Sequence, residues 1–242
     1  MQTDVIISPA GWPAVLQADF YRPESEPLSS AVLLIHGGGW TGGDNRHQMR
    51  GLSRKLAERG YFVMNITYRL TPEWRWPTQL EDVRMALRHL RENSGRYQVD
   101  PERIATMGYS AGAHLAAMAG LTDRGIQAMV LGGLPADLAL FEKGPLVVKL
   151  IGGTKQEFPG KYAAASPVNF VTSQSPPAFI YHGTRDELVP PNQPKAFVAA
   201  LAKANVPYAL EWLGGRAHIT TFLFSHGTTS RAIDFLDREM GR

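Results

Sequence analysis

The sequence predicts an α/β protein with a mainly parallel central sheet and helices on both faces. Two observations lead to this prediction. Short apolar runs alternate along the 242-residue chain with amphipathic segments of helical spacing. The apolar runs are nearly continuous, which is typical of strands that are covered on both faces. The length suits one domain that spans residues 1–242 and buries a sizeable core.

The expected elements follow one another in a regular order. Pro77 suits a first helical turn, Asn45 is the expected N-cap of another helix, and Gly60 its stop. The expected strands are 15–21 (an edge strand), 31–35, 61–67, 104–107, 128–134, 179–183 and 208–213. The expected helices are 45–59, 77–92, 111–121, 194–204 and 231–240. One excursion, at about 138–176, interrupts the alternation, and it forms either a lid or pocket wall or a surface insertion.

Composition excludes several classes of function. The net charge is only +3 and the basic residues are scattered, so nucleic-acid binding is not expected. The chain has no cysteine, which excludes a thiol nucleophile or a zinc–thiolate site. No apolar run approaches the ~18 residues of a membrane span. The start "MQTDVIISPAGW" lacks the pattern of a secretory signal, so a cytoplasmic protein is expected.

The stretch 108–112, Gly-Tyr-Ser-Ala-Gly, matches the G-x-S-x-G pattern of a nucleophile elbow. An apolar run precedes it and a helical segment rich in Ala, Leu and Met follows. Ser110 is therefore expected at a sharp corner between a strand and a helix, with small residues relieving the clashes there. The amide of Ala111 would open the helix, where free N–H groups favour developing negative charge.

A second glycine cluster, "LLIHGGGW" at 33–40, follows another buried strand. Glycines in a row indicate close approach of the backbone to a ligand. The amides of Gly38 and Gly39, with that of Ala111, are the candidate oxyanion hole. A phosphate loop is disfavoured because no Lys-Ser/Thr pair follows. His36 is interpreted as structural, holding the loop by hydrogen bonds.

A nucleophilic serine needs a general base, and the base needs an acid that orients it. His218, in the loop after the last strand, is the preferred base over His226. The preferred acid is Asp186, just past a strand end, where catalytic loops of parallel sheets gather. Asp137 and Glu187 remain alternatives for the acid.

With these residues in place, the sequence resembles the α/β-hydrolase superfamily. It is most similar to hormone-sensitive-lipase-type carboxylesterases and to feruloyl and acetylxylan esterases. The resemblance covers most of the chain from about residue 15 and is carried by "HGGGW", "YRLTPEWRWPTQLEDVRMALRHLREN", "DPERIATMGYSAGAHLA" and "SPPAFIYHGTRDELVP". It implies the triad Ser110, Asp186 and His218. Two departures, Tyr109 in place of an acidic residue and a short segment before His36, favour the branch without a large cap.

The expected function is hydrolysis of short-acyl esters, including acetyl or feruloyl esters of carbohydrates, through an acyl-enzyme. No metal or organic cofactor is expected, and the partner is a small-molecule ester. An exposed edge strand or the last helix could form a homodimer. Amide hydrolysis by the same triad (an arylformamidase or exopeptidase) and a catalytically silent binding protein are the alternatives. The candidate pocket walls are Trp40, Tyr109, Phe141, Leu188 and Val189.

Overall fold

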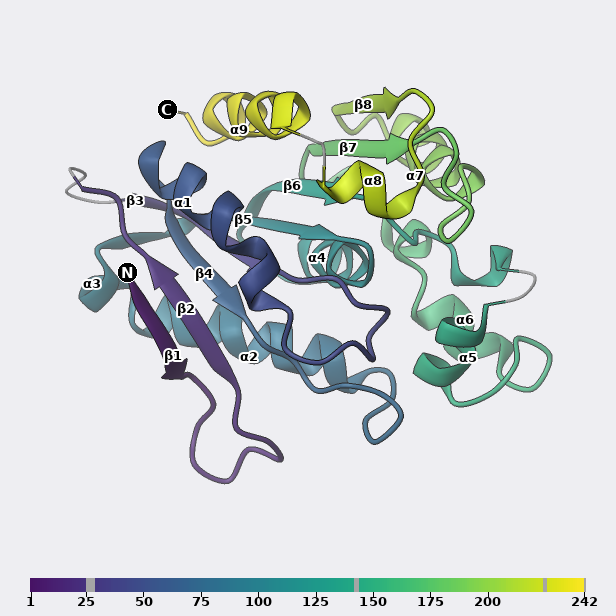
Figure 1. Cartoon of the computed structure of the whole chain (residues 1–242), viewed down its shortest axis with the longest axis horizontal. Helices are drawn as coiled ribbons and strands as arrows, with labels where there is room; N and C mark the ends of the chain where they lie inside the picture. The colour runs from purple at the N-terminus through teal and green to yellow at the C-terminus, as the bar shows by residue number, and fades with distance from the viewer. Residues whose placement is uncertain (25–28, 142–143, 224–225, 242) are drawn as a thin grey trace.

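The computed structural model describes residues 1–24, 29–141, 144–223 and 226–241, without the side chain of residue 226. One sheet of eight strands, in the order β1-β2-β4-β3-β5-β6-β7-β8, runs through this part of the chain (Figure 1). β1 and β2 are antiparallel to their neighbours, and the other pairs are parallel. The strands are β1 (Gln2–Ile6), β2 (Gln17–Tyr21), β3 (Ser29–Ile35), β4 (Phe62–Ile66), β5 (Val99–Tyr109), β6 (Ile126–Gly132), β7 (Ala178–Gly183) and β8 (Tyr208–Leu213).

Helices follow most of the strands. The α-helices are α1 (Arg50–Glu58), α2 (Thr78–Glu92), α3 (Ser94–Tyr97), α4 (Ala111–Thr122), α5 (Pro145–Ile151), α6 (Pro159–Ala164), α7 (Asn192–Lys203), α8 (His218–Leu223) and α9 (His226–Glu239). Three 3₁₀ turns are η1 (Arg46–Met49), η2 (Leu138–Leu140) and η3 (Pro167–Phe170). No helix in the described ranges is long and apolar enough to cross a membrane.

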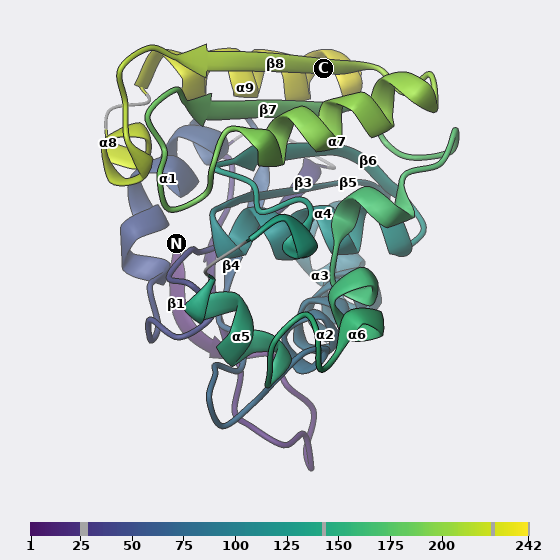
Figure 2. The same cartoon turned by 90° about the vertical axis from the view of Figure 1, so that its right-hand side faces the viewer.

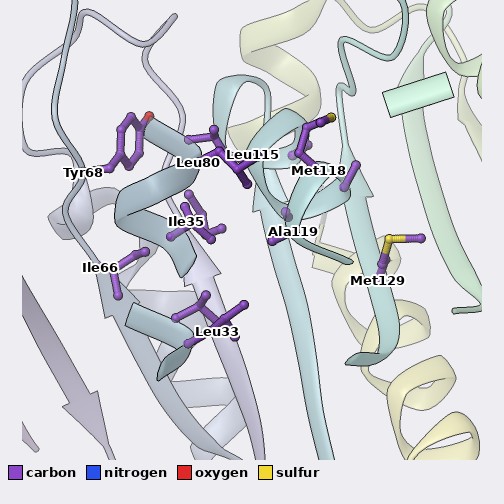
Figure 3. Close-up of a cluster of buried hydrophobic side chains, with 14 of the residues drawn as sticks. Leu33, Ile35, Ile66, Tyr68, Leu80, Leu115, Met118, Ala119 and Met129 are labelled. Atoms are coloured by element: carbon purple, nitrogen blue, oxygen red, sulfur yellow. The ribbon is translucent and has the colours of Figure 1, made fainter. Parts of the chain in front are cut away.

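The parallel strands are apolar because both of their faces are covered. All seven residues of β3 and all five of β4 are buried. On one face the core joins the strands to α2 and α4, with Leu33, Ile35, Leu80, Leu115 and Met118 in one cluster (Figure 3). On the other face a second cluster joins the alternate strand residues to α1 and α9. The predicted α/β architecture is therefore confirmed.

The strand predictions hold from β2 to β8, with corrections at the sheet's first edge. The edge is β1, which was not predicted, so the expected edge strand at 15–21 is the second strand instead. β5 begins at Val99 rather than 104, because the polar residues before Ile104 reach back to pair with the start of β3. Neither stretch carries the apolar signature from which strands are recognised.

Three expected helix boundaries also differ. Residues 45–59 form a 3₁₀ turn and then α1, and the side chain of Asn45 makes no cap hydrogen bond. Pro77 is the N-cap of α2 rather than a residue of its first turn. The last helix begins at His226, earlier than residue 231. Polar residues at helix ends carry no periodic signal, so such boundaries are the hardest to predict.

The excursion between β6 and β7 is largely ordered into short helices. It contains η2, α5, α6 and η3, and Val147, Leu150 and Ile151 of α5 are buried in the core cluster of the α2–α4 face. α5 and α6 lie near each other, beyond the ends toward which the arrows of β5, β6 and β7 point (Figures 1 and 2). That edge of the sheet is also where β3, β5, β7 and β8 deliver the predicted site residues.

Candidate active site

Ser110 lies between the last residue of β5 and the first residue of α4. Its backbone has φ 55° and ψ −122°, a conformation that L residues rarely adopt and that is often kept at functional sites. Its N–H donates to the carbonyl of Gly132 at 2.8 Å, and its own carbonyl accepts from His114 N at 3.0 Å. The strand–turn–helix corner predicted around this serine is therefore present.

The two glycines of the motif are required by close backbone contact. A Cβ on Gly112 would lie 2.0 Å from the carbonyl oxygen of Ile35 in β3, and one on Gly108 would lie 2.4 Å from the carbonyl group of Gly112. Real Cβ atoms do not come this close to backbone atoms. The first turn of α4 can therefore pass the ends of β3 and β5 only with glycine at both places.

The structure brings Asp186 and His218 together although 32 residues separate them. Asp186 is 2 % exposed in the loop after β7, and His218 is the first residue of α8, not part of a loop as expected. The two atoms His218 Nδ1 and Asp186 Oδ2 are 2.6 Å apart. Because the carboxylate accepts, Nδ1 carries the proton, which leaves Nε2 as the nitrogen able to act as a base.

The carboxylate of Asp186 is held from a second side. Its Oδ1 accepts from the N–H of Val189 at 2.8 Å. His182, the residue before the end of β7, donates from Nε2 to the carbonyl of Val189 at 2.8 Å and lies 3.5 Å from Asp186 Oδ2. Burial lowers the pKa of His182, so the neutral ring is favoured. Sequence reasoning placed His182 only inside a strand. The signal that could have identified His182 was its position at the end of a strand, just before the loop that carries Asp186.

Tyr109 was expected as a pocket wall, but it lies behind His218 instead. Its hydroxyl donates to the carbonyl of His218 at 2.6 Å, and the two ring centroids are 5.0 Å apart. Burial raises the pKa of the phenol, which keeps the hydroxyl protonated as a donor. As a strand residue next to the corner it points to the face opposite the serine pocket. Gly133, at φ +56°, leaves room for the His218 ring, because a Cβ there would lie 2.9 Å from His218 Cε1.

The peptide groups of the glycine loop are fixed through their carbonyls. The carbonyl of Gly37 accepts from His36 Nδ1 at 2.7 Å and from Asn45 Nδ2 at 3.4 Å, and the carbonyl of Gly38 accepts from Thr41 N at 3.0 Å. In a trans peptide the C=O and the following N–H point in opposite directions. The N–H groups of Gly38 and Gly39 therefore point away from these donors. The expectation that His36 holds this loop by hydrogen bonds is confirmed.

Those two N–H groups donate to no acceptor in the described ranges. Neither does the N–H of Ala111, which as the first residue of α4 has no partner within its helix. The loop also adjoins Ser110, since a Cβ on Gly37 would be 3.4 Å from Ser110 Cβ. Of these three N–H groups, that of Ala111 follows Ser110 directly, and Gly39 lines the same cavity as Ser110.

The loop is anchored further out by a buried arginine. Arg46 is 4 % exposed and pairs with Asp19 at 2.8 Å, Asp4 at 2.8 Å and Asp44 at 2.7 Å. Its backbone carbonyl accepts from the side chain of Asn65 in β4 at 3.0 Å. These contacts tie β1, β2 and β4 to the residue that follows Asn45.

A cavity of about 160 Å³ opens beside Ser110. Four of the five expected pocket walls line it, namely Trp40, Phe141, Leu188 and Val189. The excursion supplies walls that the sequence did not predict. The full lining is Gly39, Trp40, Ser110, Pro135, Phe141, Gly144, Pro145, Leu146, Val147, Glu187, Leu188 and Val189. The lining is mostly apolar.

The sequence left Asp137 and Glu187 as alternatives to Asp186, and His226 as the alternative to His218. Asp137 caps η2, accepting from Ala139 N at 3.0 Å. Glu187 is exposed at the edge of the cavity. The side chain of His226 lies outside the described part of the chain. No group of three or more His, Asp or Glu that could hold a metal ion is found among the described residues.

The chain is similar to known proteins in both sequence and structure. A family model described as BD-FAE matches residues 18–131 and 135–201. Esterase LipQ of Mycobacterium tuberculosis is 34% identical over 232 residues, which cover 86% of this chain and 55% of LipQ. The probable carboxylic ester hydrolase LipM of the same organism is 34% identical over 218 residues, covering 78% and 49%. The chain spans about half the length of these curated relatives.

Two solved structures resemble the whole chain. A truncated carbohydrate esterase from gut microbiota superposes with a TM-score of 0.92 at 24% identity, covering 99% of this chain and 96% of that one. The thermophilic esterase Est2 of Thermogutta terrifontis, with propionate bound, superposes with a TM-score of 0.82 at 25% identity, covering 98% and 93%. The likeness extends over the sheet, the helices and the excursion.

Proposed function

Because the chain belongs to the BD-FAE family and has the α/β-hydrolase fold, we propose that it is a serine carboxylesterase that acts on short-acyl esters. The observation that carries this proposal is the 2.6 Å bond between His218 Nδ1 and the buried Asp186 carboxylate, at the same sheet edge as the strained corner of Ser110. An oriented imidazole at the same sheet edge as a serine that lines a cavity is the arrangement that nucleophilic acyl transfer requires.

In the proposed reaction, His218 Nε2 takes the proton of Ser110 Oγ as this oxygen attacks the ester carbonyl carbon. Asp186 keeps the imidazole in the required tautomer and stabilises its charged form. The N–H groups of Gly38, Gly39 and Ala111 bind the oxyanion of the tetrahedral intermediate. His218 then protonates the departing alcohol. Water repeats the sequence on the acyl-serine, which releases the carboxylic acid and restores the free hydroxyl.

The oxyanion donors act because they are already oriented before the substrate binds. The carbonyls of the same peptide groups are held by His36, Asn45 and Thr41, so little reorganisation accompanies the attack. In comparable sites the loss of one such donor lowers kcat by about 10²–10³-fold.

The size of the cavity supports a short acyl group. Its volume of about 160 Å³ is below the ~300–1,000 Å³ of ordinary ligand pockets, and its walls are mostly apolar. A small apolar chain such as acetyl or propionyl suits this space. The two similar structures, a carbohydrate esterase and an esterase with bound propionate, support acetyl esters of carbohydrates as the substrate class.

The test is kcat/KM on p-nitrophenyl esters from acetyl to dodecanoyl, with Ser110→Ala as the matched blank. We expect activity that declines beyond about four carbons and falls by at least ~10³-fold in the variant. A fluorophosphonate probe should label the wild-type protein but not the variant. The rate on p-nitroacetanilide, the amide that corresponds to p-nitrophenyl acetate, distinguishes an amide hydrolase from an esterase. Activity that persists in folded Ser110→Ala would refute the serine assignment.

A further inference from the structure

A second cavity, of about 300 Å³, lies inside the excursion. Its lining is Phe141, Gly144, Val147, Val148, Thr154, Lys155, Gln156 and Tyr162. Three of these residues, Phe141, Gly144 and Val147, also line the cavity beside Ser110. The two cavities therefore have one wall in common, formed by these three residues. α5 and α6 lie close together on this side of the molecule (Figure 2).

Of the three shared residues, only Phe141 has a large side chain. Gly144 has none, and a Cβ there would be 3.0 Å from Phe141 Cβ, so the two residues are in close contact. Val147 is short and 2 % exposed, fixed in the core by α5. Phe141 is only partly buried and packs against the edge of that core. Its ring is therefore the main part of the common wall and the part that can be removed with least damage to the core.

The cavity beside Ser110 receives the acyl side of an ester rather than the alcohol side. The carbonyl carbon must meet Ser110 while its oxygen meets the N–H of Gly39, and both residues line the cavity. The alcohol must leave toward the nitrogen that protonates it, on His218. His218 does not line this cavity. The chain attached to the carbonyl carbon is therefore the part of the substrate that extends toward Phe141.

We propose that Phe141 is the residue that limits acyl-chain length, and that the cavity behind it is an extension of the acyl site from which the Phe141 ring separates the first cavity. This inference rests on the proposed esterase function. With Phe141 present, the chain ends at its ring. Without the ring, the two cavities join into a space within the ordinary range for ligand pockets. The extension is lined by apolar Val147 and Val148 together with polar Thr154, Lys155 and Gln156, so it takes a medium-length alkyl chain or an aryl acyl group that carries a polar substituent.

The experiment compares acyl series from two to twelve carbons on one alcohol, p-nitrophenol. Phe141→Ala should move the preferred length from two to four carbons to about six to eight, and raise the ratio of octanoyl to acetyl kcat/KM by at least ~10-fold. Leu140→Ala is the matched control, because Leu140 precedes Phe141 in the chain, lines neither of the two cavities and is 40% exposed. It should leave the length limit where it is in the wild type.

A second variant refills the extension. Val148 lines only the cavity behind Phe141, so Phe141→Ala with Val148→Phe should restore the short-chain preference. If Phe141→Ala does not fold, as judged by circular dichroism, Phe141→Leu serves with a smaller expected shift. Labelling by a fluorophosphonate probe, as in the wild type, shows that the reaction centre is intact.

The outcomes separate the two proposals. A wild-type protein with no esterase activity contradicts the proposed function. An active wild type whose Phe141→Ala variant keeps the same chain limit overturns the role of Phe141 alone. A shift that appears when the alcohol is lengthened at constant acetyl, and not when the acyl chain is lengthened, also overturns it. A shift on the acyl series that Val148→Phe reverses supports it.

Discussion

His114 should make the folded protein lose stability as the pH falls from 7 to 4. This side chain lies on α4, one turn after Ser110, and is 0% exposed. Its Nε2 donates to the carbonyl of Ala165 at 2.7 Å, and its Nδ1 is buried with no hydrogen-bond partner. The rings of Trp40 and Trp76 lie 5.2 and 5.4 Å away, centroid to centroid. A second proton has no acceptor in this site, so the neutral ring is strongly favoured.

Burial lowers the pKa of His114 from 6.5 to about 4 in the folded protein. Between these two values the unfolded chain binds a proton that the folded protein does not bind. The free energy of unfolding therefore decreases as the pH falls through this window and changes no further from this group below pH 4. A difference of about 2.5 pH units at 1.36 kcal/mol per unit gives a loss of about 3 kcal/mol. That is a large part of the ~5–15 kcal/mol that stabilises an ordinary domain.

The assay is urea unfolding followed by tryptophan fluorescence at pH values from 7 to 4. His114→Gln keeps a donor for the Ala165 carbonyl but cannot titrate. His36 and His182 also have pKa values lowered by burial, so the wild-type slope contains their contributions as well. The difference between wild type and His114→Gln should change by about 3 kcal/mol across the range. His47→Gln, on the exposed surface of η1, is the control. Equal pH slopes in wild type and His114→Gln would refute the reasoning.

Three further predictions follow from the site. Gly112→Ala should lower the free energy of unfolding by about 3 kcal/mol or more, because its Cβ would overlap a β3 carbonyl. Gly51→Ala in α1, where the new Cβ would meet open space, should raise the free energy of unfolding by ~0.5–1 kcal/mol. The urea midpoints of the two variants check this. Asp186→Asn should lower kcat by about 10⁴-fold while Asp137→Asn changes it little, and equal losses in steady-state assays would remove Asp186 from its role. Asn45→Ala should lower kcat about tenfold with KM nearly unchanged, because Asn45 orients the Gly37–Gly38 peptide group through the Gly37 carbonyl. This loss is smaller than the loss expected when a whole oxyanion donor is removed. A change confined to KM would contradict the orienting role.

Much of the fold is encoded in local pattern, and the exceptions have a physical reason. β8 has the predicted bounds, 208–213, because an apolar run between two turns is a local signal. β1 escaped prediction because four of its five residues are exposed and its stability comes from partners far along the chain. It pairs with β2, and Asp4 pairs with Arg46, 42 residues away. No window of a few residues contains that information.

The residues of the candidate site also fall into those with a local sequence signal and those without one. The corner of Ser110 and the glycine loop could be recognised because each is a short backbone device with its own residue requirements. The partner of His218 could be predicted only from chain order and strand ends, as one choice among several carboxylates. Leu146 and Val147 could not be foreseen as walls, since that depends on how the excursion folds back over the sheet. Tyr109 was misplaced because it shares a face of β5 with Ala105 and Met107, and the sequence did not show that this face lies away from the cavity.

The cavity beside Ser110 is built from two parts of the chain, and only one of them takes part in the hydrogen bonds of the candidate site. The strand ends and the loop after β7 contribute Ser110, Gly39 and Val189, which belong to the strained corner, the glycine loop and the hydrogen bond to Asp186. The excursion contributes Phe141 and Leu146, whose side chains make none of those hydrogen bonds. Natural selection or a mutagenesis library can thus reshape the cavity through small changes in the excursion, each of which leaves the hydrogen bonds around Ser110, Asp186 and His218 in place.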